Sequence, residues 1–148
     1  MKAVHRLATL DDARRLFELR RKSILALAPK GMSVAQAEIW AANLTVAGME
    51  GKIREMEIWI VALNDTVVGW GALRGDQLEG LYTDPEFAGQ GIGTELLGML
   101  EGLMRERGLP AVRAQASSNA EEFYLRRGYQ PIGLRTPAGA QPVTKRLS

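Results

Sequence analysis

The sequence contains no cysteine and only one histidine, His5. The first absence excludes disulfides, thiolate catalysis and cysteine-based zinc sites, and a single histidine cannot form a histidine cluster around a metal. Neither charge dominates, since 19 lysine and arginine residues stand against 17 aspartate and glutamate residues. No basic run is interleaved with aromatic residues, so nothing supports a nucleic-acid partner. We therefore expect neither a bound metal nor a nucleic acid.

Long apolar runs are missing as well. None approaches the roughly 20 residues that cross a bilayer, and the first residues lack the pattern of a secretory signal. We therefore expect no membrane association and a cytoplasmic location. The 148 residues, 46% of them hydrophobic, are enough for a single domain, residues 1–148, that buries most of its unfolded surface.

Positive charge gathers on the first long helical pattern. Apolar residues from Ala13 onward fall mainly on one helix face, behind a capping box formed by Thr9 and Asp12. Five basic residues lie elsewhere on the same segment: Arg14, Arg15, Arg20, Arg21 and Lys22. We interpret them as a solvated helix face in preference to a partner-binding patch.

Further patterns predict the other elements. Apolar runs between turn residues predict strands over residues 4–8, 58–63, 66–73, 77–83, 112–117, 132–134 and 143–147. A capping box at Ser33 and Gln36 predicts a second helix, and a short helix is expected over residues 120–127. Residues 48–57 are interpreted as a loop or a frayed turn. The two apolar arms of the hairpin at residues 58–73 indicate a sheet that is covered on both faces.

Glycines inside these elements predict close contacts. Gly69 and Gly71 weaken their strand and permit the close approach of another element, while Gly80 favours a β-bulge. Gly98 and Gly102 lie four residues apart on one helix face. Each costs about 1 kcal/mol relative to alanine, which suggests that this face packs closely against a strand.

The most informative stretch covers residues 78–97. An apolar run of strand type, residues 78–83, is stopped by Asp84-Pro85, because proline cannot donate to a sheet ladder and marks a turn. A helical apolar period starts at Leu96. Between the two, three glycines follow at alternate positions: Gly89, Gly91 and Gly93.

A strand, a glycine loop and a helix N-terminus in this order predict an anion-binding site. The first N–H groups of a helix lack internal partners and carry partial positive charge, and glycines let the backbone approach a phosphate. A glycine loop can also be a plain tight turn, but the surrounding order favours the site. A P-loop is excluded because no lysine follows Gly93, and a dinucleotide fingerprint because Thr94 or Leu96 occupies its third glycine position.

The stretch resembles motif A of the GNAT superfamily of acyl-CoA-dependent N-acetyltransferases, in which Q/R-x-x-G-x-G/A follows a strand. Here the strand ends in Leu81-Tyr82-Thr83 and the loop is Ala88-Gly89-Gln90-Gly91-Ile92-Gly93. In the family this loop wraps the pyrophosphate of coenzyme A. The position usually held by Gln or Arg is Ala88, so that side-chain contact is missing while the backbone cradle is kept.

A second segment, residues 117–129, resembles motif B of the same family, N-x-x-A-x-x-F/L-Y-x-x-x-G-F/Y. The residues in register with it are Ala120, Phe123, Tyr124, Gly128 and Tyr129. The Asn position of the motif holds Ser117, and Asn119 lies two residues later. The resemblance covers essentially the whole chain. It implies an α/β (α+β) GNAT fold, with a mostly antiparallel mixed sheet of about six to seven strands flanked by about four helices.

The resemblance implies transfer of an acetyl group from acetyl-CoA to a primary amine. Without cysteine or a well-placed histidine a covalent acyl-enzyme is not expected, so direct attack is favoured. The family often places an acidic residue on the strand before the loop, which makes Glu79 the candidate base. Asp76, Asp84 and Glu57 are alternatives, and Glu79 could instead be an exposed strand carboxylate.

The candidate acid is Tyr124, because in the family a tyrosine at this position protonates the sulfur of coenzyme A. Its alternative is a packed aromatic residue. The family also implies that the Leu81 N–H stabilises the oxyanion and that Leu81 and Thr83 pair with the pantetheine amides. The full set of expected cofactor-binding residues is Leu81, Tyr82, Thr83, Gly89, Gln90, Gly91, Ile92, Gly93, Thr94, Asn119 and Phe123.

The acceptor amine leaves no readable signal in the sequence. In the family the first two helices commonly border the acceptor groove, so residues 25–31 and Trp40 are candidates to shape specificity. A homodimer is common in the family and is expected here by analogy. The competing hypothesis is a non-catalytic acyl-CoA-binding sensor with the same fold, which the alanine at position 88 keeps open.

Overall fold

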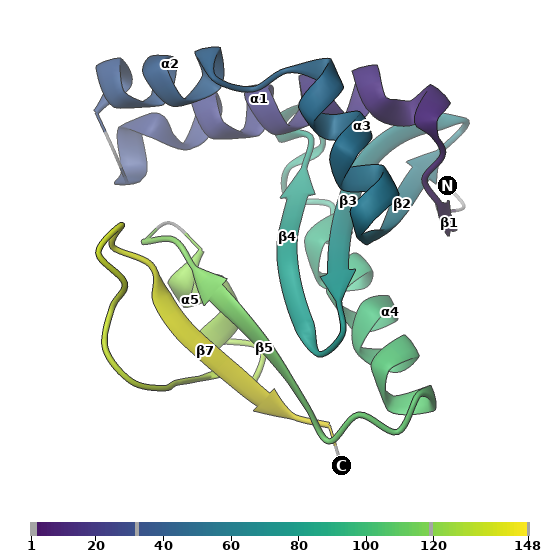
Figure 1. Cartoon of the computed structure of the whole chain (residues 1–148), viewed down its shortest axis with the longest axis vertical. Helices are drawn as coiled ribbons and strands as arrows, with labels where there is room; N and C mark the ends of the chain where they lie inside the picture. Colours follow the sequence, from purple (N-terminus) through teal and green to yellow (C-terminus); the bar gives the residue numbers. More distant parts are fainter. Residues whose placement is uncertain (1–2, 32, 119, 148) are drawn as a thin grey trace.

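The computed structural model describes residues 3–31, 33–118 and 120–147, without the side chains of residues 27–31 and Trp40. Within these residues, one seven-stranded mixed sheet has the order β1-β2-β3-β4-β5-β7-β6 (Figure 1). The strands are β1 (Ala3–Leu7), β2 (Glu57–Leu63), β3 (Thr66–Arg74), β4 (Gln77–Thr83), β5 (Ala111–Ala116), β6 (Gln130–Pro131) and β7 (Gln141–Arg146). All neighbouring pairs are antiparallel except β4 with β5.

Helices cover both faces of this sheet (Figure 1). The described residues form α1 (Ala13–Gly31), α2 (Val34–Ala42), α3 (Val46–Glu55), α4 (Ile92–Glu106) and α5 (Glu121–Leu125), one helix more than expected. Alternate residues of β2 enter two different cores: Ile60 packs with α1 and α3, whereas Val61 packs with α4. The predicted sheet with two covered faces is therefore confirmed, as are the two capping boxes at Thr9 and Ser33.

Two predicted elements are wrong. Residues 48–57 are not a loop, because α3 occupies Val46–Glu55, capped by a hydrogen bond from the Gly48 N–H to the Thr45 hydroxyl at 2.9 Å. Its glycines disguise the pattern, while burial of Met49 in the core holds it in place. The strand expected at residues 132–134 lies instead at Gln130–Pro131, since Gly133 has a φ of 66° that interrupts an extended chain.

No described helix has both the length and the apolar character needed to cross a membrane. Across the same described residues, no three acidic or histidine side chains gather as possible metal ligands.

The glycines of β3 let α4 lie close to the sheet. A Cβ built on Gly71 would fall 2.6 Å from Leu100 Cδ1 of α4, and one built on Gly69 would fall 3.2 Å from Ile92 Cγ2. The predicted close approach at these two positions is confirmed. The same expectation for Gly98 and Gly102 is wrong, because a Cβ at either position would have no atom of the described residues within 4 Å.

These contacts give opposite expectations for two alanine substitutions. Gly71→Ala should destabilise the fold by about 1–3 kcal/mol, because the new methyl group overlaps the buried Leu100 side chain. Gly98→Ala, the matched control in open space, should stabilise the protein by about 0.5–1 kcal/mol through helix propensity. Urea denaturation of the two variants measures both. Equal effects of the two substitutions would contradict the packing described for α4.

Candidate active site

The sheet opens between β4 and β5, its only parallel pair in the described residues. The two strands pair at Gln77 with Arg113 and at Leu78 with Ala114, and then diverge into a V (Figure 1). A β-bulge at Glu79, directly before Gly80, shifts the register of β4 against β3 at this point. The predicted irregularity at Gly80 is thus confirmed to within one residue, and a bulge bends the strand that carries it.

The backbone direction of β4 beyond the bulge follows from one hydrogen bond. The Asp84 N–H donates to the Val68 carbonyl of β3 at 2.8 Å. Backbone groups of successive strand residues point to opposite edges, so those of Tyr82 also face β3. The N–H and C=O groups of Leu81 and Thr83 therefore face the V, where β5 has already diverged.

A cavity of about 410 Å³ lies at the mouth of the V. This volume falls within the range of about 300–1,000 Å³ typical of small-molecule sites. Its lining comes from α1, β4 and the turn after it, the N-terminus of α4 and the region of α5: Ser23, Ala26, Leu81, Thr83, Asp84, Pro85, Ala88, Gly93, Ala120, Phe123 and Tyr124.

The N-terminus of α4 presents uncapped N–H groups. Gly91, its N-cap, has a φ of 74° and no side chain with which to cap the helix. The first N–H bonded in the usual helical pattern is that of Glu95, to the Gly91 carbonyl at 3.0 Å. The three preceding N–H groups, of Ile92, Gly93 and Thr94, have no partner within the helix. Together with the helix dipole they favour an anion.

Tyr124 lines the cavity although only 6% of the residue is exposed. Its ring makes edge contacts with Phe123 and Tyr129, at centroid distances of 5.4 and 5.1 Å. Burial first, and then the neighbouring Tyr82, raises the pKa of the Tyr124 phenol above its ordinary value. This hydroxyl is therefore protonated at neutral pH and is available as a proton donor.

A sequence model described as "Acetyltransferase (GNAT) domain" matches residues 28–139, most of the chain. The chain belongs to the GNAT acetyltransferase family. A search of curated proteins finds no significant match.

Solved structures of GNAT proteins share the fold. One is a GCN5-related N-acetyltransferase from Rhodopseudomonas palustris, with 28% identity, a TM-score of 0.86 and coverage of 99% of this chain and 96% of that one. Another is the PaiA N-acetyltransferase of Thermoplasma acidophilum in complex with coenzyme A, with 20% identity, a TM-score of 0.83 and 99% coverage of both chains. An aminoglycoside 6'-acetyltransferase type Ii has 18% identity and a TM-score of 0.75, covering 98% of this chain and 97% of its own.

The cavity of this GNAT protein brings together five of the expected site residues: Leu81, Thr83, Gly93, Phe123 and Tyr124. Gly89, Gln90 and Gly91 form the exposed loop before α4, where Gly89 has a φ of 81° that suits glycine. The side chain of Ile92 is buried in the core, so only its backbone can face a ligand. Asn119 lies outside the described residues.

Tyr82 points away from the cavity. Its ring packs against Trp70 at a centroid distance of 4.7 Å, and the Arg20 guanidinium lies 5.4 Å above it. This is the core formed with α1 and α3. Gly80 makes room for the ring, since a Cβ there would fall 2.8 Å from Tyr82 Cε2. The Tyr82 ring thus lies on the face of the sheet that α1 and α3 cover, away from the cavity at the mouth of the V.

The four acidic base candidates differ in how tightly they are held. Asp76 pairs with Arg113 at 3.0 Å and Glu57 with Arg107 at 2.7 Å. Glu79 has only a 3.8 Å contact with Arg74, and it does not line the cavity. Glu79 is therefore the least engaged carboxylate of the four, although it is not brought together with Tyr124.

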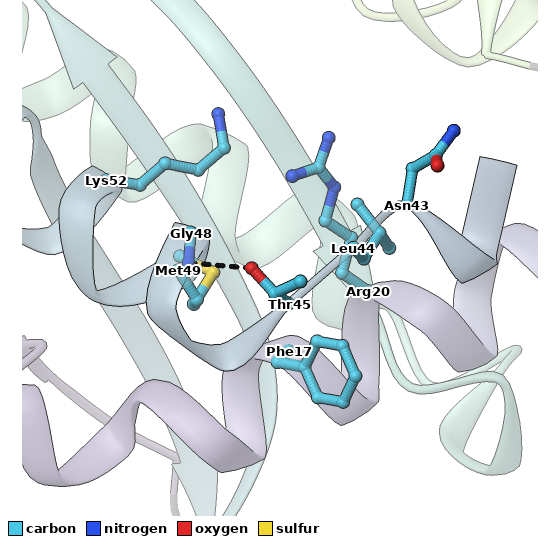
Figure 2. Close-up of a pocket in the computed structure, with 8 residues that line it drawn as sticks. All are labelled: Phe17, Arg20, Asn43, Leu44, Thr45, Gly48, Met49 and Lys52. Carbon is cyan, nitrogen blue, oxygen red and sulfur yellow. Dashed lines mark hydrogen bonds between the residues drawn. The ribbon is translucent and has the colours of Figure 1, made fainter.

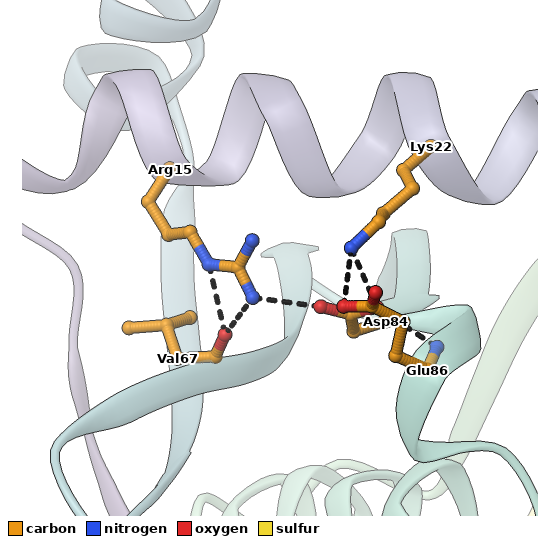
Figure 3. Close-up of polar contacts among 5 residues, drawn as sticks. All are labelled: Arg15, Lys22, Val67, Asp84 and Glu86. Atoms are coloured by element: carbon orange, nitrogen blue, oxygen red, sulfur yellow. Dashed lines mark hydrogen bonds and ion pairs between the residues drawn. The ribbon is translucent and has the colours of Figure 1, made fainter.

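Asp84, the fourth candidate, is a structural clamp (Figure 3). It is 1% exposed and accepts hydrogen bonds from Arg15 at 2.8 Å, from Lys22 at 3.3 Å and from the Glu86 N–H at 2.9 Å. Burial alone would raise the pKa of Asp84, but the Glu86 N–H and the two cations outweigh it and lower the pKa. An ionised, fully paired carboxylate is a poor base.

The clamp corrects the interpretation of the α1 charges as a solvated face. Arg15 also donates to the Val67 carbonyl at 2.7 Å, and Lys22 pairs with Glu86 at 2.7 Å, so α1 is tied to the end of β4. Arg20 is likewise engaged through Tyr82. Two of the five charges therefore fix the strand that leads into the glycine loop.

Arg127 is a site residue that the sequence did not reveal. It lies four residues after Phe123, its guanidinium stacks 3.7 Å from the centre of that ring, and its Nε donates to the Thr94 hydroxyl at 3.0 Å. A cation therefore lies beside the uncapped N-terminus of α4. The glycine loop before that helix supplies no side-chain contact of its own at Ala88. In the sequence, the available signal was the spacing of four residues between Phe123 and Arg127, and this spacing does not indicate a ligand-binding residue.

The clamp predicts the stability of an Asp84→Asn variant. The substitution should cost about 1.5–3 kcal/mol at neutral pH, because charged hydrogen bonds to Arg15 and Lys22 are lost. Because the pKa of Asp84 is lower in the folded state, the Asp84 carboxylate stabilises the wild type at pH values above its unfolded-state pKa near 3.9. This stabilisation is lost as the pH falls through the folded-state pKa. The difference in unfolding free energy between wild type and variant should therefore shrink below about pH 4. A difference independent of pH from 7 to 2.5 would contradict the clamp.

Proposed function

We propose that this protein is an N-acetyltransferase that moves the acetyl group of acetyl-CoA to a primary amine by direct attack. The observation that supports it best is the composition of the 410 Å³ cavity. There Tyr124 shares one space with the open edge of β4 and with the uncapped N-terminus of α4. These are a proton donor, a row of amide groups and an anion site, the three features that the reaction needs.

The residues present fit coenzyme A. The free C=O group of Leu81 and the free N–H and C=O groups of Thr83 suit the pantetheine amides, which would extend the sheet as an added strand, and the Leu81 N–H is left for the acetyl oxygen. The N–H groups of Ile92, Gly93 and Thr94 suit the pyrophosphate, with Arg127 nearby as a cation. Gly93 keeps the passage open, since a Cβ there would meet Phe123 and Thr83, each at 3.4 Å. The coenzyme A complex of the Thermoplasma structure supports this fit by similarity of fold.

Each residue then has a defined task. The acceptor nitrogen forms a bond to the acetyl carbon while the carbon–sulfur bond breaks. The Leu81 N–H would donate a hydrogen bond to the acetyl oxygen as charge develops on it. Tyr124 would give its proton to the departing sulfur, and the proton of the nitrogen would leave through water to Glu79.

Glu79 is better placed to receive the proton through water than to contact the acceptor nitrogen directly. It approaches Arg74 at 3.8 Å, and Arg74 approaches Glu55 of α3 at 4.0 Å, so Glu79 lies near the C-terminal end of α3. We infer that the acceptor approaches from the side of α1 and α3. The cytoplasmic location and the homodimer remain predictions.

Removing the Tyr124 hydroxyl is the direct test. Tyr124→Phe should lower the rate of thiol release from acetyl-CoA, in the presence of a primary amine, by about 10²–10⁴-fold. The affinity for coenzyme A, measured by calorimetry, should be unchanged because the ring still packs on Phe123 and Tyr129.

Tyr129→Phe is the matched control. This substitution removes the 2.7 Å hydrogen bond to Glu101 in the core, so it should cost about 1–3 kcal/mol of stability and leave turnover close to wild type. Equal turnover of Tyr124→Phe and wild type would remove Tyr124 from the mechanism. Coenzyme A binding without turnover on any amine would favour the non-catalytic sensor.

A further inference from the structure

A second cavity, of about 160 Å³, lies between α1 and the start of α3 (Figure 2). It is lined by Phe17, Arg20, Asn43, Leu44, Thr45, Gly48, Met49 and Lys52. The volume is below the range of about 300–1,000 Å³ for a whole small-molecule ligand, yet it is large enough for a group of a few heavy atoms. The cavity is thus suited to one functional group of a larger ligand.

Both charged residues that line this cavity are cations. Figure 2 shows the head groups of Arg20 and Lys52 extending in the same direction from two different helices. Within the described part of the chain, neither has a carboxylate within 4.0 Å. The Arg20 Nε is buried and makes no hydrogen bond to any residue that the structure describes. A buried donor without a partner is destabilising, and the described protein atoms do not supply a partner here.

The electrostatics of Lys52 agree with this geometry. Burial lowers the pKa of Lys52, and repulsion from Arg20 lowers it further. Glu55 and Glu79 act in the opposite direction, but each approaches Arg74, at 4.0 and 3.8 Å, and neither lines the cavity. An anion held between the head groups of Arg20 and Lys52 would relieve the repulsion between them.

The cavity is close to the acetyl-transfer site. Arg20 lies over the ring of Tyr82, and Tyr82 stands between Leu81 and Thr83, whose backbone groups face the V. On α1, Arg20 is three residues before Ser23, which lines the 410 Å³ cavity. Residues of α1 about one helical turn apart therefore line the two cavities.

We propose that Arg20 and Lys52 form an anion subsite that binds the carboxylate of the acceptor, so that the acceptor is an amino acid or another small amine that carries a carboxylate. This inference rests on the proposed N-acetyltransferase function. The ammonium group of such an acceptor is directed toward Glu79 and its carboxylate toward the two cations. Polycationic acceptors such as polyamines and aminoglycosides are disfavoured, since they would bring positive charge to a cavity that already holds two cations.

The test compares each amino acid with its amide, which lacks the carboxylate charge, and with two polycations. The protein is assayed with acetyl-CoA and each of the twenty amino acids, with the corresponding amino acid amides, and with spermidine and kanamycin. At least one amino acid should be acetylated with a kcat/KM about tenfold or more above that of its amide. The inference is overturned if every amide equals or exceeds its acid, if only polycations react, or if nothing in the panel reacts.

Variants locate the effect in this cavity. Arg20→Met and Lys52→Met should each raise KM for the preferred amino acid by about tenfold or more, with KM for its amide and for acetyl-CoA unchanged. Arg21→Met, the neighbouring exposed arginine on α1, is the matched control and should behave as wild type. A purely structural role would move all three KM values together, and that result would overturn the subsite.

Coenzyme A binding separates this inference from the proposed function. If calorimetry detects coenzyme A binding while the amino acids are poorer acceptors than their amides, only the anion subsite fails. If coenzyme A does not bind, the proposed function fails, and the subsite fails with it.

Discussion

The divergence of β4 from β5 after Leu78 is the constraint on which the site depends. Two paired residues hold the sheet together at Gln77 and Leu78, and the bulge at Glu79 then turns β4 away. Beyond that point β4 has no strand neighbour on one side among the described residues, so its amide groups face a cavity. Elsewhere such an open edge would invite aggregation. Here α1 and the N-terminus of α4 border the opening, so access is limited to a ligand of suitable shape.

Long-range polar contacts keep the V in this form. The Asp84 clamp fastens α1 to the end of β4 on one side. On the other side, buried Glu101 of α4 accepts hydrogen bonds from Tyr129 at 2.7 Å and from Lys145 of β7 at 3.0 Å. Each arm of the V is thus tied to a helix, and the Tyr124 ring packs edge-on against the ring of Tyr129. The rigid surroundings are what allow a single hydroxyl to be placed against a ligand.

The local part of this architecture could be predicted from the sequence, and the long-range part could not. The strand, the glycine loop and the helix N-terminus follow each other along the chain, so their order alone indicated an anion site. The partners of Asp84 are 62 and 69 residues away, and the cations on α1 resemble an ordinary solvated face. Helix α3 was missed because its capping residue Thr45 precedes two glycines, while tertiary burial of Met49 stabilises it. Lys52, which lines the second cavity together with Arg20, belongs to that helix, so the second cavity was equally hidden.

Amide NMR of the 16.2 kDa protein tests most directly whether the V is a coenzyme A site. Titration with coenzyme A should shift the N–H signals of Leu81 and Thr83 together with those of Ile92, Gly93 and Thr94. Pantetheine alone should shift mainly the β4 signals and ADP alone mainly the α4 signals, because the two halves of the ligand contact different elements. If neither group of signals shifts, or if the shifts cluster on another face of the sheet, the V is not a coenzyme A site.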